Sequence, residues 1–280
     1  MIESILNEST VNLHRANHII KINATKSMRN AILFFLLFNF LSGSGQSLKF
    51  GLHAGTDFTW ITTNDAAIYS NRGMMGFSLG TRASFAWRHD WWMIASADLH
   101  MNEGGTLTYK QGGNYLPLSE LTDPALNHGP QPLQDGTSIQ YKLQYWSVLL
   151  GIAKSFQIQD DQKLLLEFPS FQISKILRSN GNISKESLIA ENENIINDLN
   201  KFNIGFSTGL GIEKQFNRNN SVYVTLRYSQ GLSDLTKNKG YKSTLILGNN
   251  KDNTADLYIQ HPDKSNAILH NISLKVGLLF

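Results

Sequence analysis

The C-terminal segment 268–280 alternates without a break between an almost wholly apolar row and a mostly small or polar row. The first row ends at Phe280, and the second includes Ser273 and Lys275. Successive side chains of a strand point to opposite faces, so this pattern predicts a β-strand. A strand of this kind that ends on an aromatic residue is typical of the closing strand of an outer-membrane barrel. We interpret Phe280 as the C-terminal assembly signal, read by the barrel assembly machinery.

Seven earlier segments alternate with the same period, the fourth and the fifth less cleanly. Pro169 predicts a bulge or an edge distortion in the fifth. The connections after the second, fourth and sixth segments are short, and the others are longer. Outer-membrane barrels have short periplasmic turns and long extracellular loops. We therefore predict an all-β fold, an eight-stranded antiparallel up-and-down transmembrane β-barrel with both termini in the periplasm. The seven segments are 48–60, 75–87, 91–109, 139–154, 163–176, 202–216 and 222–231.

The apolar rows are too many to fit inside eight strands, so we expect them to face lipid and the charged rows to face the lumen. An eight-stranded barrel is just wide enough for its interior to be filled by side chains. We expect opposite charges to pair there into a plug and leave no wide water channel. The predicted lumen charge network consists of Lys49, His53, Asp57, Arg82, Asp98, His100, Glu167, Glu213, Arg227 and Lys275.

Composition narrows the classes of function. The chain has no cysteine, which excludes disulfides, thiolate metal sites, a cysteine nucleophile and a lipid-modified cysteine. Its formal net charge of +3 over 280 residues does not point to a nucleic-acid partner.

The N-terminal region predicts export. The apolar run Ala31–Leu41 is shorter than the roughly 20 residues that span a bilayer as a helix. With Lys26 and Arg29 before it and small residues after it, the run reads as a signal peptide. Met28 is then the expected start of translation, residues 1–45 contain the signal peptide with an upstream extension, and residues 46–280 form the barrel domain of an outer-membrane protein.

Two stretches match the serine-hydrolase pattern G-x-S-x-G, one around Ser78 and one around Ser207. That motif needs a sharp turn between a strand and a helix, whereas both matches lie inside extended runs, so we favour small lumen-facing residues. Asp98 and His100 share a face and would suit a metal site or an acid–base pair. No third ligand follows from spacing, and we favour an ion pair or hydrogen-bond network.

The long loops offer weaker signals. The loop 102–138 contains oxygen ligands without a known calcium spacing, which favours a solvated surface loop. Apolar residues near helical spacing predict a short helix over 184–201. Two β-rich runs, 243–247 and 255–259, predict a hairpin that extends the last two barrel strands. Three lysines at its base are candidates for contact with lipopolysaccharide phosphates or for a solvated charge run: Lys237, Lys239 and Lys242.

Several stretches together resemble the PorT-like outer-membrane barrel family of Bacteroidetes. They are Phe50–Gly55, Asn102–Tyr109, Leu143–Leu150, Gly209–Glu213 and Arg227–Asp234. The resemblance covers nearly all of 48–280. Ser147 and Leu149 depart from the acidic residue and the proline usual in the family's fourth strand. The resemblance implies an accessory of protein secretion whose partners are other envelope proteins.

From these patterns we expect a non-enzymatic outer-membrane barrel with a structural or interaction role and no cofactor or metal. Its expected surroundings are outer-membrane lipid and lipopolysaccharide. The alternatives are a narrow pore for small solutes, which requires lumen charges that line a gap, and a membrane-embedded hydrolase that uses Ser78 or Ser207.

Overall fold

The computed structural model describes residues 48–280 except 128–131, 218–219 and 247–256. The predicted signal peptide lies outside the described residues. Strands dominate this part of the chain, with two short 3₁₀ helices, η1 (Pro124–Leu126) and η2 (Ile196–Asp198). None of the helices in the described ranges has the length and apolar character needed to cross a bilayer.

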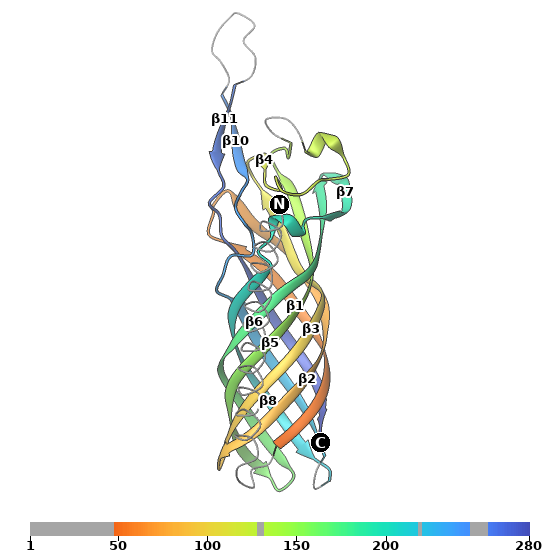
Figure 1. Cartoon of the computed structure of the whole chain (residues 1–280), viewed down its shortest axis with the longest axis vertical. Helices are drawn as coiled ribbons and strands as arrows, with labels where there is room; N and C mark the ends of the chain where they lie inside the picture. Colours follow the sequence, from red (N-terminus) through yellow and green to blue (C-terminus); the bar gives the residue numbers. More distant parts are fainter. Residues whose placement is uncertain (1–47, 128–131, 218–219, 247–256) are drawn as a thin grey trace, which may run out of the picture. The chain divides into compact units, whose positions relative to one another are not determined.

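Eight strands form a closed antiparallel ring (Figure 1). Each pairs with its neighbour along the ring, and the pairing of the first strand with the last closes it. Phe50 and Phe280 exchange backbone hydrogen bonds of 2.9 and 2.7 Å at this seam. The predicted eight-stranded up-and-down barrel is confirmed. In ring order the strands are β1 (Leu48–Thr63), β2 (Ile68–Arg88), β3 (Trp91–Tyr109), β5 (Thr137–Gln159), β6 (Gln162–Lys185), β8 (Phe202–Gln215), β9 (Ser221–Gly231) and β12 (Ala267–Leu279).

The two ends of the barrel differ. At one end, here called the turn end, lie the short connections β2–β3, β5–β6 and β8–β9, the start of β1 and the end of β12. The other end, the loop end, carries a separate three-stranded sheet of β4 (Gly113–Asn114), β10 (Tyr241–Ile246) and β11 (Leu257–Pro262). Figure 1 shows β10 and β11 projecting beyond the barrel strands.

The helix predicted over 184–201 is wrong. β6 continues to Lys185 and turns back into β7 (Ser187–Asn194), with which it pairs. Glu186 adopts a positive φ of 55° at this turn. Within 184–201 the only helical segment is the short η2. The flanking residues Ile195 and Leu199 are buried at the loop end and are not part of a longer amphipathic helix.

Two other local predictions are confirmed. The pairing of β6 with β8 shifts register between Glu167 and Ser170, where Pro169 forms the expected bulge. The predicted hairpin appears as β10 and β11, although part of it lies outside the described residues. It pairs with β4 and is not a continuation of β9 and β12, contrary to expectation.

The outer surface of the turn-end half is covered by exposed apolar side chains, here called the apolar belt. Met75, Leu52 and Phe280 are 62%, 59% and 58% exposed. Strands β1 and β12 turn small, polar or charged residues inward, as the alternation predicts. Strands β3 and β5 also bury a small apolar cluster of Trp92, Ile94, Leu149 and Ala153 at this end. The belt comprises Phe50, Leu52, Phe58, Met75, Phe77, Leu79, Trp87, Met93, Trp146, Leu150, Phe156, Phe171, Ile173, Phe202, Leu210, Phe216, Leu226, Ile272, Leu274, Val276, Leu278 and Phe280.

Toward the loop end the interior becomes apolar, which the sequence analysis did not anticipate. We call this cluster the upper core. Along β5, the inward row changes from Ser147 to Tyr145, Leu143 and Tyr141, all buried. The cluster also includes Ile61, Ile68, Leu107, Tyr109, Tyr115, Leu133, Ile139, Ile176, Ile183, Ile195, Leu199 and Leu235. Burial of this apolar surface stabilises the loop end of the barrel.

Candidate functional site

Glu167 occupies the centre of the lumen and is 1% exposed. Arg82 Nη1 on β2 donates to its Oε1 at 2.6 Å, and Arg227 Nε on β9 donates to its Oε2 at 2.9 Å. Three strands that are not neighbours in the ring are thus joined by charge-assisted hydrogen bonds. The arrangement fills the lumen at this level.

A second group surrounds Asp98. Lys275 Nζ donates to Asp98 Oδ1 at 2.8 Å, and Ser96 Oγ donates to Oδ2 at 3.1 Å. His53 Nε2 also bonds Asp98, while its Nδ1 lies 2.7 Å from the Tyr223 hydroxyl. Strands β1, β3, β9 and β12 therefore meet through buried polar side chains.

The turn end is closed by an ion pair between Lys49 and Glu213. Ser221 Oγ donates to Glu213 Oε1 at 2.7 Å. The Lys49 side chain is 18% exposed and lies over the Trp92 ring, with 5.6 Å from Nζ to the ring centroid. Lys49 is thus the member of the predicted network closest to solvent.

Nearer the loop end, Asp57, His100 and Glu103 form what we call the acid–histidine cluster. His100 Nδ1 lies 2.6 Å from Glu103 Oε1, and Tyr145 donates to Glu103 Oε2. Asn271 Nδ2 donates to Asp57 Oδ1 at 3.2 Å and to Glu103 Oε2 at 3.3 Å. Asp57 and Glu103 are both 0% exposed.

The ten residues of the predicted network all have lumen-facing side chains, and each has at least one of the polar contacts described above. The partners that sequence reasoning missed include Glu103, Tyr145, Tyr223 and Asn271. Glu103 was invisible because strict alternation from His100 places it on the outer face. The pairing of β3 with β5 shifts register between His100 and Glu103, and Asn102 has a φ of 58°, which turns Glu103 inward.

Ser78 and Ser207 lie in the middle of extended strands β2 and β8. Ser78 Oγ is buried without a hydrogen-bond partner in the described part of the chain, and Ser207 Oγ donates to the Tyr228 carbonyl at 3.2 Å. Among the described residues neither hydroxyl is hydrogen-bonded to a histidine or a carboxylate, as an activated nucleophile requires. Packing explains the second glycine of the first motif, because a Cβ at Gly80 would lie 2.3 Å from Asp98 Oδ1.

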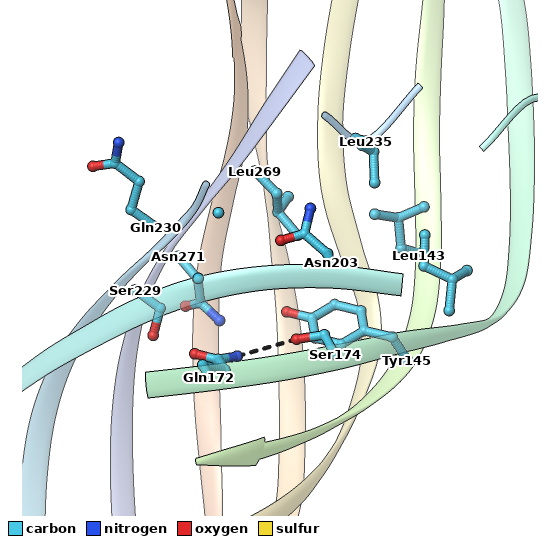
Figure 2. A pocket seen from close by; sticks show the side chains of 13 residues that line it. Leu143, Tyr145, Gln172, Ser174, Asn203, Ser229, Gln230, Leu235, Leu269 and Asn271 are labelled. Atoms are coloured by element: carbon cyan, nitrogen blue, oxygen red, sulfur yellow. Dashed lines mark hydrogen bonds between the residues drawn. The ribbon is translucent and has the colours of Figure 1, made fainter. Parts of the chain in front are cut away.

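A cavity of about 30 Å³ lies where the polar lumen meets the upper core (Figure 2). Leu143 and Leu235 line it on one side, and Gln172, Asn203 and Asn271 on another. A neighbouring cavity of about 10 Å³ also touches Gln172 and Asn271. One water needs roughly 10–15 Å³ of such volume, so these spaces suit individual waters and not a sugar or amino acid.

In the loop 102–138, the candidate oxygen ligands Asn127 and Asp135 form hydrogen bonds within the loop itself. Asn127 exchanges hydrogen bonds with the Leu121 backbone at 2.9 and 2.7 Å. Asp135 Oδ1 accepts from the Gly112 N–H at 2.6 Å. The loop is not wholly solvated as expected, because its Tyr115, Leu116, Leu121, Leu126 and Leu133 are buried in the upper core.

Two of the three lysines near the hairpin have protein partners. Lys242 pairs with Asp65, and Lys237 Nζ donates to the Asn197 carbonyl at 2.6 Å. Lys237 and Lys242 are therefore already engaged with oxygen atoms of the protein, which weakens the case for a lipopolysaccharide contact at this place.

Outside the belt, Asp198 of η2 accepts a hydrogen bond of 3.0 Å from the Leu118 N–H and another from the Ser119 hydroxyl. Burial raises the pKa of Asp198 above its ordinary value, and these hydrogen bonds oppose the shift. Burial likewise raises the pKa of Tyr109 and Tyr141, whose hydroxyls lie 2.7 Å apart.

No protein-family model matches the sequence, and no curated protein matches it either. The resemblance to the PorT-like family therefore stays a prediction.

Among solved structures, the chain is similar to Neisserial surface protein A (11% identity, 84% of this chain and 98% of that chain, TM-score 0.38). It is also similar to the attachment invasion locus protein Ail of Yersinia pestis in complex with a heparin analogue (11%, 84% and 99%, 0.34). A third is the outer membrane protease OmpT of Escherichia coli (10%, 84% and 95%, 0.31). At these values the similarity says nothing about role, and the fold assignment rests on the strand pairing.

Proposed function

We propose that this protein spans the bacterial outer membrane through its apolar belt. Side chains such as Leu278 and Leu150, 53% and 57% exposed, would be costly in water around a whole ring of strands but match a bilayer interior. By the rule of short periplasmic turns, the turn end, with the start of β1 and the end of β12, faces the periplasm. Phe280, at the end of the closing strand, then lies where the assembly machinery would recognise it.

We further infer a non-enzymatic, non-conducting role in which the loop end contacts other molecules. One observation carries this proposal: paired charges fill the lumen at several levels, with Glu167 bound by Arg82 and Arg227 at its centre. A solute path would require these charges to line a gap. The parts available for contact are β7 and the projecting β10–β11 hairpin.

The finer role that we propose is that of an accessory of an envelope complex, whose partners are the secretion proteins implied by the resemblance to the PorT-like family. Edge strands such as β11 can add a strand to an extended segment of another protein. Lipid and lipopolysaccharide would surround the belt.

Conductance across a planar bilayer tests the plug. We expect no steady ohmic current from the native protein, with heat-modifiable migration on a denaturing gel showing that the barrel is folded. The control is the triple variant Arg82→Ser, Glu167→Ser, Arg227→Ser, which removes the central charges and should admit small ions. A steady current from the native protein would overturn the closed-lumen proposal in favour of the narrow pore.

Pull-down of detergent-solubilised native protein tests the interaction role. We expect envelope proteins to co-purify, and a variant shortened by residues 241–262 to lose them while its barrel still shows heat-modifiable migration. If the native protein recovers no partner, or the shortened variant recovers the same ones, the proposed role of the hairpin fails.

A further inference from the structure

The acid–histidine cluster carries more negative charge than its surroundings balance. In the described part of the chain, the only ion pair to Asp57 or Glu103 is that between His100 and Glu103. The lumen cations Arg82, Arg227 and Lys275 are bonded elsewhere, to Glu167 and Asp98. Two buried carboxylates this close repel each other strongly unless a cation or a proton compensates them.

The donor atoms converge in a way that suits a metal ion. One ligand atom from each of Asp57, His100 and Glu103 lies within 4.8 Å of the other two. A tetrahedral Zn²⁺ with donors at about 2.0–2.2 Å holds them about 3.4 Å apart. The present separations, from 2.6 Å between His100 Nδ1 and Glu103 Oε1 up to no more than 4.8 Å within the group, bracket that spacing.

Two oxygen atoms beside the cluster have no hydrogen-bond partner among the residues that the structure describes. They are Asp57 Oδ2 and Asn271 Oδ1, in residues that are 0% and 6% exposed. The Asn271 amide lies between Asp57 and Glu103, and half a turn of its plane exchanges Nδ2 for Oδ1. That rotation turns a fourth oxygen donor toward the same point.

The surroundings also orient the imidazole. His100 Nε2 lies 3.0 Å from Ser147 Oγ, and the ring stacks on Tyr145 with 4.5 Å between centroids. A hydrogen bond on one ring nitrogen leaves the other available as a ligand, which is the usual support of a metal-binding histidine. The Tyr145 hydroxyl likewise donates a hydrogen bond to Glu103 Oε2 and so orients this carboxylate.

We propose that Asp57, His100, Glu103 and Asn271 bind a first-row divalent cation, with Zn²⁺ as the representative, inside the lumen. One imidazole, two carboxylates and an amide oxygen are ligands that Zn²⁺ and Mn²⁺ accept. The cation ties β1, β3 and β12 together at the boundary between the polar lumen and the upper core. The water-sized cavity beside Tyr145 and Asn271 adjoins the site (Figure 2).

The test uses untagged native protein in detergent, stripped with a chelator and titrated with Zn²⁺, and in separate arms with Mn²⁺ and Ca²⁺. We expect one Zn²⁺ per chain by elemental analysis and calorimetry, and a higher temperature of heat modification with Zn²⁺. Glu103→Gln and Asp57→Asn should each weaken binding at least tenfold. Ser147→Ala should weaken it by about 10–100-fold through loss of support for His100.

The matched control is His53→Gln, which changes a lumen imidazole outside the cluster and should keep its Zn²⁺ affinity within about twofold of the native value. If one variant does not fold, the other still tests the site, and Co²⁺ absorption of the native protein reports its ligands directly. Less than one Zn²⁺ per chain in the native protein would overturn the proposal. So would Zn²⁺ affinities of the Glu103→Gln and Asp57→Asn variants equal to the native affinity. If a shared proton, and not a metal ion, compensates the carboxylates of Asp57 and Glu103, the native protein should fail to bind one Zn²⁺ per chain. In that case Asp57→Asn should also make the barrel more stable.

Discussion

Lys275 on β12 donates a hydrogen bond of 2.8 Å to Asp98 on β3, although β1 and β2 separate these strands in the ring. The two side chains are 4% and 2% exposed. Backbone ladders join only neighbouring strands, so this ion pair adds a tie across the barrel. Such ties connect distant parts of the ring and make its opening more cooperative.

Lys275→Met should destabilise the barrel by about 3–5 kcal/mol, because it leaves Asp98 as a buried charge without its cation. Denaturant unfolding of the detergent-folded protein measures the change. Lys214→Met is the control, since Lys214 near the end of β8 pairs with Asp161 of the β5–β6 turn at 3.8 Å and both side chains are exposed. That pair is worth less than about 1 kcal/mol. Equal losses for the two variants would contradict the assigned role of Lys275.

Gly80→Ala should destabilise by about 1–3 kcal/mol through overpacking of the lumen. The new Cβ would lie 2.3 Å from Asp98 Oδ1, 2.7 Å from His53 Nε2 and 2.7 Å from the Ala97 carbonyl, and the last of these cannot rotate away. Thermal unfolding of the detergent-folded protein measures the effect.

Ser78→Ala is the matched control on the same strand. It removes a buried hydroxyl that has no partner, so stability should stay unchanged or rise slightly. A larger loss for Ser78→Ala than for Gly80→Ala would show that the motif is not explained by packing.

Tyr141→Phe should destabilise by about 1–3 kcal/mol, since it leaves the buried Tyr109 hydroxyl without its partner. The double variant Tyr109→Phe, Tyr141→Phe removes both hydroxyls and should recover most of that loss. Double-mutant analysis of denaturant unfolding measures the coupling. Strictly additive effects would show that the two hydroxyls do not depend on each other.

Asp198 should make the loop end less stable as pH rises. Its folded pKa is raised above the ordinary value of 3.8, so the folded state holds the proton more tightly than the unfolded state. Stability is then highest below that ordinary value and falls as pH increases through the folded pKa.

Hydrogen-exchange protection of residues 116–122, corrected for intrinsic rates, measures this effect from pH 3 upward. Asp198→Asn, which cannot ionise, should show a flat profile over the same window. A native profile that rises with pH would contradict the predicted sign.

The sequence by itself determined the strands and the direction of their faces in the belt. Alternation is a local property of an extended backbone, so the inward Lys275 and the outward Leu274 and Val276 could be predicted from a single segment. Pro169 marked a bulge for an equally local reason, since its nitrogen has no hydrogen to donate.

Only the tertiary structure decided which side chains contact each other across the lumen. The partners of Glu167 come from β2 and β9, and no spacing along the chain encodes the contact of side chains across a lumen. Glu103 entered the lumen because a bulge breaks the alternation on which its sequence assignment depended. The inward row of β5 carries apolar Leu149 on one side of Ser147 and apolar Leu143 on the other, and alternation alone predicts neither kind of side chain. Alternation gives the two faces of each strand, whereas the surroundings decide which kind of side chain each face must bury.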